Sequence, residues 1–446
     1  MIVDCVLANA KAYFKQAIVD CSIAFNEGRI FKIGRESSMP TADARFDLKN
    51  QLVLPGLIDA HVHLRDEGKS YKEDFVSGTA AAAAGGMTTV LDMPNNEPVT
   101  TSADALKNRM KVAKGRILVD VGFRSEFPGN VGEIEGIVRE GAVGFKFFMV
   151  NQVGGLDVND DEAMLEAFKA VGKLEVTTSV HAEDEQTLKR AEAELQRRRQ
   201  NDVAAFLKAH SEKVELRAVT RVLDTVKQGN VHVHFCHVST LEGLGAIAAG
   251  KKSGMPISCE ATPHHLLLTV DDLKKAGTLG VTMPPVRDKQ HAEALWEGVR
   301  NGWVDIVASD HAPHAIGEKE AETVWDVKAG IPGVETTLPL LLTQVKRGRL
   351  SIGDVARLMS EKPAEIFSLK GKGCLREGND ADLTVVDVRK KFRIDSSNFQ
   401  SKAKYSPFDG REVEGKPAKT FVGGQLIMDE GEIVAKPGSG RIIRRQ

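Results

Sequence analysis

Apolar runs of strand length alternate with helical stretches through the middle of the chain. The eight runs read VLPGLIDAH, TTVLDMP, ILVDVGF, VGFKFFM, LEVTTSVH, VHVHFCHV, PISCEAT and VDIVASD. Each is followed by a segment of helical composition, such as HAEALWEGVRNG, and several of these segments end at a glycine that can close a helix. Continuous apolar strands alternating with helices indicate a parallel sheet with a helical cover. Eight repeats predict an α/β fold, the (β/α)8 TIM-like barrel.

The two ends of the chain have a different pattern. Residues 2–52 contain short β-rich pieces separated by turn residues, and residues 381–388 and 419–434 repeat this style. We therefore expect both termini to pair into one small β-sandwich domain. The predicted division is a composite β domain from residues 1–53 and 372–446, and the barrel from residues 54–371.

His61 and His63 close the first barrel strand. Side chains two residues apart on a strand point the same way, so the two imidazoles can bind one metal ion. An isolated pair of this spacing is as often two ordinary half-buried histidines. The other barrel strands decide between these interpretations, because active sites of such barrels lie at the carboxyl ends of the strands.

Four more polar side chains fall at that level. His181 ends LEVTTSVH, His237 follows VHVHFC, and Asp310 ends VDIVASD. Lys146 lies inside VGFKFFM, where burying an unpartnered ammonium is costly, so it must be neutralised or modified. Four imidazoles, a carboxylate and a lysine exceed the needs of one tetrahedral zinc, which indicates two ions with a shared ligand.

The composition limits the kinds of molecule that the protein is expected to bind. The chain has 60 Lys+Arg against 62 Asp+Glu, and a net charge of -2 carries no signature of nucleic-acid or membrane-surface binding. Its five cysteines form no CxxC pair, which argues against a disulfide framework. We see no secretory signal pattern and no membrane span in the sequence, and expect a cytoplasmic enzyme with a small-molecule substrate.

With these residues in view, the chain resembles the amidohydrolase superfamily and, within it, the cyclic amidohydrolases: dihydroorotases, allantoinases, hydantoinases and dihydropyrimidinases. The resemblance spans nearly the whole length. It implies two-metal hydrolysis of a cyclic amide, with Asp310 also moving a proton between water and the ring nitrogen. The implied ligand set is two zinc ions per chain, one held by His61, His63 and Asp310, the other by His181 and His237, with carbamylated Lys146 as the bridge.

The stretch ASDHAPHAIGEK, residues 308–319, resembles the dihydroorotase signature. That likeness implies that Arg65, Asn95 and His314 hold a substrate carboxylate, and a guanidinium fork suits this task. The competing interpretation of Arg65 is an ion pair with Asp66 or Glu67. The implied reaction is the reversible hydrolysis of L-dihydroorotate to N-carbamoyl-L-aspartate in pyrimidine (UMP) synthesis, by an enzyme that forms homo-oligomers and can associate with aspartate transcarbamoylase.

Three positions depart from the usual pattern. Glu67 replaces a common proline, and Met283 replaces an asparagine in TMPPVR. Lys146 stands where many bacterial single-function dihydroorotases have a bridging aspartate, so the chain resembles the carboxylated-lysine branch. Met283 is the departure that most favours a rival: an allantoinase, hydantoinase or dihydropyrimidinase acting on an uncharged ring. A non-enzymatic relative would have lost metal ligands, whereas all six positions are filled here.

The remaining histidines receive no catalytic role. His264 and His265 are interpreted as packing or supporting residues, because the ligand set is already full. The pair His232 and His234 shares a strand face and is expected to be structural. Two others, His210 and His291, fall in helical stretches and are expected to face solvent.

Overall fold

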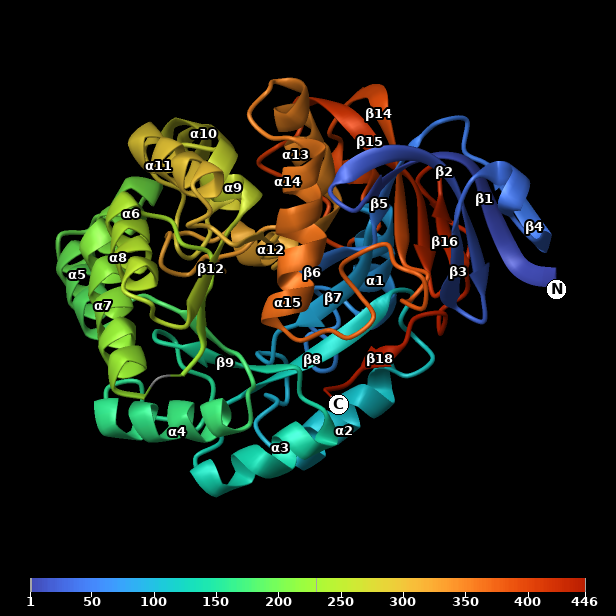
Figure 1. The fold of residues 1–446 in the computed structure, drawn as a ribbon. Coiled ribbons are helices and arrows are strands. Elements are labelled where there is room, and N and C mark those ends of the chain that lie inside the picture. Colours follow the sequence, from blue (N-terminus) through green and yellow to red (C-terminus); the bar gives the residue numbers. More distant parts are fainter. Residues whose placement is uncertain (1, 230, 446) are drawn as a thin grey trace.

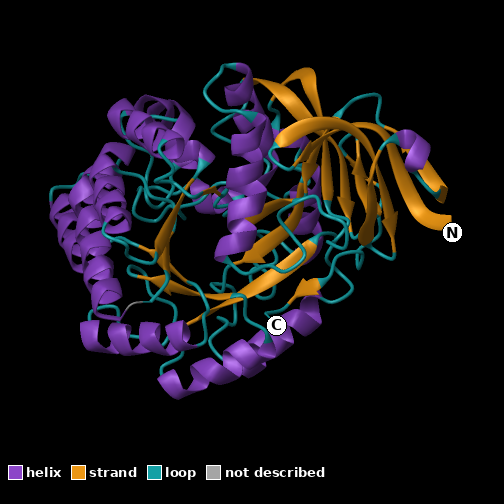
Figure 2. Cartoon of the chain, viewed as in Figure 1, coloured by secondary structure: helices purple, strands orange, loops and turns teal. Residues whose placement is uncertain are grey.

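The structure is a computed structural model that describes residues 2–229 and 231–445. Eight parallel strands curve into a nearly closed barrel, in chain order, which confirms the predicted fold class (Figures 1 and 2). Every one of the eight apolar runs overlaps one of these strands. They are β6 (Leu57–Val62), β7 (Met87–Asp92), β8 (Asp120–Glu126), β9 (Gly144–Phe148), β10 (Thr178–His181), β11 (Val233–Phe235), β12 (Ile257–Ala261) and β13 (Ile306–Val307).

The barrel closes between its first and last strands through a few isolated contacts. The last strand, β13, has two residues and forms no ladder with β6. Val62 and His311 form a parallel bridge, and the His63 N–H donates to the His311 carbonyl at 2.8 Å. Below them, the buried carboxylate of Asp59 accepts from the Ser309 N–H at 3.1 Å. We call this junction the barrel seam.

Helices cover the outside of the barrel. The first, α1 (Phe75–Ala84), begins at a capping box in which Asp74 accepts from the Ser77 N–H. It ends at Gly85, where an added Cβ would lie 2.3 Å from the Val334 carbonyl oxygen, so only glycine allows this contact. The other helices are α2 (Ala103–Ala113), α3 (Ile134–Glu140), α4 (Asp161–Lys173), α5 (Glu185–Arg197), α6 (Val203–Ala209), α7 (Glu212–Gly229), α8 (Leu241–Lys252), α9 (Pro263–Leu267), α10 (Val270–Ala276), α11 (Lys289–Arg300), α12 (Ile316–Lys319), α13 (Val334–Lys346), α14 (Ile352–Ala356) and α15 (Lys362–Ile366).

A second, mostly antiparallel sheet combines both ends of the chain, seen as blue and red strands side by side in Figure 1. Its N-terminal and C-terminal parts meet where β5 pairs with β14, with Val53 opposite Val385. A last short strand, β18 (Ile442–Ile443), lies outside this sheet and pairs in parallel with β8 of the barrel. The sheet contains β1 (Ile2–Phe14), β2 (Ala17–Asn26), β3 (Arg29–Gly34), β4 (Thr41–Asp47), β5 (Leu52–Pro55), β14 (Leu383–Arg393), β15 (Glu412–Val422), β16 (Gln425–Asp429) and β17 (Glu432–Ile433).

The apolar core lies between the barrel strands and their helices. Strand residues such as Phe123, Phe145 and Phe235 belong to this core. Residues that alternate with them face the barrel interior. Barrels of this kind usually fill their interior with branched apolar side chains, but here several of these positions are buried and polar. They include Arg124, Lys146, Ser179, His234, Ser258 and Glu260.

Candidate metal centre and substrate site

Three of the predicted ligands converge at the carboxyl end of the barrel, across the seam. His61 and His63 come from β6, and Asp310 follows β13. Asp310 Oδ1 lies 3.2 Å from His61 Nε2 and 3.3 Å from His63 Nε2. Their donor atoms all lie within 4.8 Å of one another. Two imidazole nitrogens and a carboxylate oxygen at this separation suit a single divalent ion.

Two more of the predicted ligands face each other beside this group. His181 ends β10 and His237 follows β11. The Nδ1 atom of His181 is 3.0 Å from Nε2 of His237. The ring of His237 also lies against His61, with centroids 5.3 Å apart. The two pairs of imidazoles therefore form one continuous cluster.

Lys146 lies on β9 with a fully buried side chain. Its Nζ has no oxygen or nitrogen hydrogen-bond partner among the described residues and lies 5.0 Å from the Phe148 ring centroid. Burial lowers the pKa of His61 to about 4, and the nearby ammonium acts in the same direction. Burial also lowers the pKa of His63 and His237, so these two imidazoles and His61 are held in the neutral form, which is the form that binds metals.

Three residues of this region have left-handed backbone conformations. The φ angles are 63° for Arg65, 31° for His237 and 47° for Asp310. Non-glycine residues adopt positive φ uncommonly, and such strain concentrates where function requires a particular side-chain direction. Each of the three residues directly follows or closely follows a barrel strand.

Acidic and amide groups orient three of the imidazoles from behind. Glu260 contacts His61 Nδ1, while Glu183 lies 2.9 Å from His181 Nε2. Although burial opposes ionisation, the adjacent histidines hold the pKa of both carboxylates well below the ordinary range. Asn95 Oδ1 lies 2.7 Å from His63 Nδ1. Neither glutamate was predicted: Glu260 is far from His61 along the chain, whereas Glu183 is only two residues from His181, and this short spacing was the signal that could have identified it.

Arg65 has no carboxylate within ion-pair distance among the described residues. Its Nη2 lies 3.2 Å from His314 Nε2, and its Nε donates to the Pro313 carbonyl at 3.3 Å. The two carboxylates of the competing interpretation point elsewhere, because Asp66 pairs with Arg116 at 2.7 Å and Glu67 accepts from Asn108 at 2.9 Å. The buried guanidinium fork therefore lacks the anion that it ordinarily takes.

His314 lies among cations. Its Nδ1 is 3.1 Å from Lys72 Nζ, and its Nε2 is also 3.1 Å from the Ala329 carbonyl oxygen. Burial lowers its pKa, and the charges of Arg65, Lys72 and Lys319 lower it further. Lys72 also pairs with Glu318 at 2.8 Å. Positive groups outnumber negative ones around this imidazole, which favours an anionic ligand.

Lys319 ends the signature stretch and is fully buried in α12. Its Nζ donates to three backbone carbonyls, those of Val281 at 3.0 Å, Lys328 at 2.9 Å and Gly330 at 2.9 Å. Residues 328 and 330 flank Ala329, whose carbonyl contacts His314. Lys319 therefore fixes the loop against which His314 packs.

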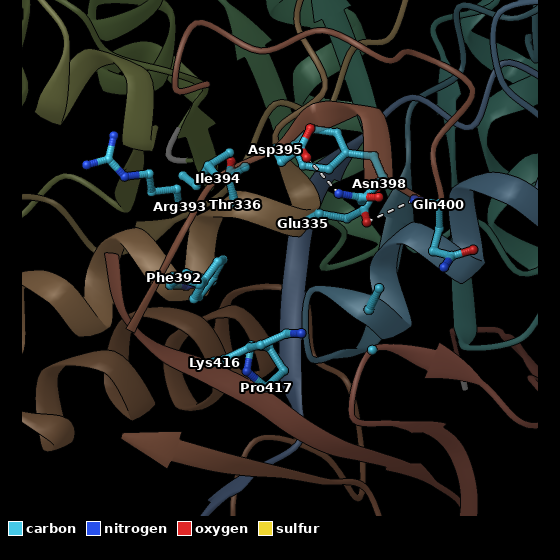
Figure 3. Close-up of a pocket in the computed structure, with 14 residues that line it drawn as sticks. Glu335, Thr336, Phe392, Arg393, Ile394, Asp395, Asn398, Gln400, Lys416 and Pro417 are labelled. Carbon is cyan, nitrogen blue, oxygen red and sulfur yellow. Dashed lines mark hydrogen bonds between the residues drawn. The ribbon is translucent and has the colours of Figure 1, made fainter. Parts of the chain in front are cut away.

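A cavity of about 210 Å³ lies between α13 and the β14–β15 connection (Figure 3). Glu335 reaches it, and its carboxylate accepts from the backbone N–H groups of Gln400 and Ser401. Burial raises the pKa of Glu335 to about 7. The Ser401 hydroxyl donates in turn to Glu73, which lies 3.4 Å from His311. Hydrogen bonds thus connect this cavity to Glu73, whose carboxylate lies within ion-pair distance of the residue after Asp310.

Two expectations about other histidines were wrong. His210 and His291 are 1% and 2% exposed and do not face solvent. Glu183 turns His210 inward, with its carboxylate 2.7 Å from His210 Nδ1. His291 accepts from the Leu241 N–H at 3.0 Å. A helical pattern places a histidine on a helix, but it does not identify a partner beneath that helix.

Comparisons with known proteins agree with this geometry. The sequence profile of the Amidohydrolase family matches residues 52–427. The chain is 36% identical to a dihydroorotase of Methanosarcina acetivorans, across 99% of this chain and 95% of that protein. It is 33% identical to an L-hydantoinase of Paenarthrobacter aurescens, across 99% and 98% of the two chains.

Solved structures give a similar result. The L-hydantoinase (dihydropyrimidinase) from Arthrobacter aurescens superimposes with a TM-score of 0.96 at 33% identity, covering 99% of this chain and all of that one. A D-hydantoinase superimposes with a TM-score of 0.93 at 26% identity, covering 100% and 99%. None of the helices in the described part of the chain has the length and apolar composition to cross a membrane.

Proposed function

The chain belongs to the amidohydrolase family and is a cyclic amidohydrolase, and we propose that within this family it acts as a dihydroorotase. The reaction is the reversible hydrolysis of L-dihydroorotate to N-carbamoyl-L-aspartate, a step of pyrimidine synthesis. The observation that carries the proposal is the buried guanidinium of Arg65, which lies beside the ligand cluster without a carboxylate partner among the described residues. Archaeal dihydroorotases among the relatives support the same choice.

We assign two zinc ions to the histidine cluster, in the arrangement that the family resemblance implies. His61, His63 and Asp310 hold one ion, and His181 and His237 hold the other. Among the described residues, the buried Nζ of Lys146 has no oxygen or nitrogen acceptor, which supports carbamylation, because a carbamate turns a costly cation into an anion with two ligand oxygens. The ions would supply Lewis acidity toward the ring carbonyl and lower the pKa of water.

The protein's own residues position the substrate and move the proton. Arg65, Asn95 and His314 bind the carboxylate of the ring and so present one carbonyl to the cluster. The Asn95 oxygen faces His63, which leaves its amide N–H groups for the ligand. Asp310 accepts a proton from water and donates it to the departing ring nitrogen. In the synthetic direction, the same carboxyl group takes the proton from the nitrogen.

A hydantoinase is the second candidate, and two observations favour it. The L-hydantoinase relative matches almost the whole chain, and a structure of this class superimposes closely. Met283, whose sulfur lies 3.9 Å from the Asn151 amide nitrogen, stands where dihydroorotases usually have asparagine. A hydantoin ring carries no carboxylate, so this candidate leaves Arg65 without a ligand.

A side-by-side assay on dihydroorotate, hydantoin and allantoin tests the proposal, with zinc content measured on the same sample. We expect the highest kcat/KM on dihydroorotate and about two zinc ions per chain. A preference for an uncharged ring would refute the dihydroorotase assignment. Oligomer size and co-elution with aspartate transcarbamoylase, both predicted above, are measured on the same preparation by size-exclusion chromatography.

A further inference from the structure

A chain of hydrogen bonds runs through the barrel interior, starting behind His61. Glu260 contacts His61 through one oxygen and lies 3.0 Å from His234 Nε2 through the other. The hydroxyl of Ser258 is 2.9 Å from His234 Nδ1 and 3.3 Å from His232 Nε2. His232 Nδ1 is in turn 3.3 Å from the Thr177 hydroxyl. We call Glu260, His234, Ser258, His232 and Thr177 the barrel column.

The strand register builds this column. His234 on β11 and Ser258 on β12 are paired across neighbouring parallel strands, so their side chains point into the barrel together. Glu260 is two residues further along β12 and faces the same way, closer to His61. Buried polar groups are costly unless they are hydrogen-bonded to one another, and here His234 has a partner at both ring nitrogens.

The donors and acceptors of the hydrogen bonds in the barrel column can be assigned. Glu260 faces two imidazole nitrogens and also accepts from the backbone N–H of His237 at 3.1 Å. A carboxylate accepts hydrogen bonds, so both imidazole nitrogens that face it carry their protons. His61 then has its proton on Nδ1 and its lone pair on Nε2, the atom that faces Asp310. In His234, Nδ1 is the acceptor, and the Ser258 hydroxyl donates to it.

We propose that Glu260, His234 and Ser258 are positioning residues, which set the metal affinity of the His61–His63–Asp310 group by holding His61 in its ligating tautomer and orientation. The inference rests on the metal centre proposed above and is independent of the substrate. Partners behind metal-binding histidines commonly contribute 10- to 100-fold in affinity. His234 acts through Glu260, since it does not touch Asp310 or His63.

The test compares Co²⁺ affinity of full-length variants, by competition with a coloured chelator, and the visible spectrum of bound Co²⁺. His234→Leu removes the donor to Glu260, whereas His234→Gln retains an amide donor. We expect a loss of about 10-fold or more for His234→Leu, with a changed spectrum, and a smaller loss for His234→Gln. We expect Ser258→Ala to lose less Co²⁺ affinity than His234→Leu, because Ser258 is one hydrogen bond further from His61 than His234 is.

His291→Leu is the matched control, because His291 is equally buried and hydrogen-bonded but lies in α11, outside the barrel. We expect it to lower the melting temperature without changing Co²⁺ affinity. Wild-type affinity and spectrum in folded His234→Leu would overturn the inference. So would an equal loss in His291→Leu, or no Co²⁺ binding by the wild type. If the affinity pattern holds but dihydroorotate is not a substrate, the substrate assignment fails and the column's role stands.

Discussion

Replacing Arg65 by methionine keeps the length and apolar contacts of the side chain but removes the guanidinium fork. Arg65 is 6% exposed, so water replaces little of the lost interaction. A desolvated, charge-assisted contact of this kind contributes about 3–4 kcal/mol to transition-state binding, which corresponds to a loss of roughly 10²- to 10³-fold in kcat/KM. Arg65→Lys keeps the charge but loses the fork, and we expect an intermediate loss.

The assay follows ring opening of dihydroorotate and of dihydrouracil, the same ring without the carboxylate. We expect the loss for Arg65→Met on dihydroorotate alone, because the uncharged ring gives the guanidinium nothing to bind. Arg116→Met is the control, since Arg116 pairs with Asp66 on the neighbouring loop and is 37% exposed at its side chain. An equal loss on both rings would show that Arg65 supports the fold of the site rather than the carboxylate, and would refute the reasoning.

Three further predictions follow from the same structure. Lys319→Met frees the loop that holds Ala329, so KM for dihydroorotate rises about 10-fold with a smaller change in kcat, and an unchanged KM contradicts this role. Asp310→Asn lowers kcat by about 10³-fold or more, because the amide cannot accept the proton, and steady-state kinetics on zinc-loaded protein measure the loss. Burial raises the pKa of Glu335 to about 7 from an ordinary 4.5, so its contribution to stability is present at low pH and is lost as the pH rises through 7. The melting temperature of Glu335→Gln minus that of the wild type should therefore increase as the pH rises from 5 to 8. A difference that stays constant over this range would exclude the raised pKa.

The sequence was sufficient to predict the barrel and the end of the barrel at which the candidate site lies. Eight apolar runs predicted eight strands, and the polar residues that end three of these runs, His61, His181 and Asp310, lie together at the carboxyl end of the barrel. This succeeds because strand alternation and the shared direction of parallel strands are local properties. The domain boundaries at residues 53 and 372 stay a prediction.

Side-chain contacts between residues on different strands could not be predicted from the sequence. His234 was expected to be merely structural, because its pattern shows which face it shares but not that Glu260 lies between it and His61. The same limit applies to His210, which follows α6, because its partner Glu183 follows β10 and is 27 residues earlier in the chain. The pairing of β18 with β8 joins segments separated by more than 300 residues, and no local pattern specifies such a contact.

The proposed metal centre spans the barrel seam, so an ion bound there also affects how the barrel closes. His61 and His63 stand on one edge of that junction and Asp310 on the other, so an ion bound by all three acts as a clasp between two strands that share no ladder. Metal binding is then coupled to closure of the barrel, and the free energy of binding adds to the stability of the folded state. After chelation only the isolated hydrogen bonds of the seam join β6 to β13, so we expect the two strand edges to separate more readily and to pair with neighbouring molecules. We expect the chelated protein to become turbid on mild heating, and early return of the metal ion to prevent this aggregation.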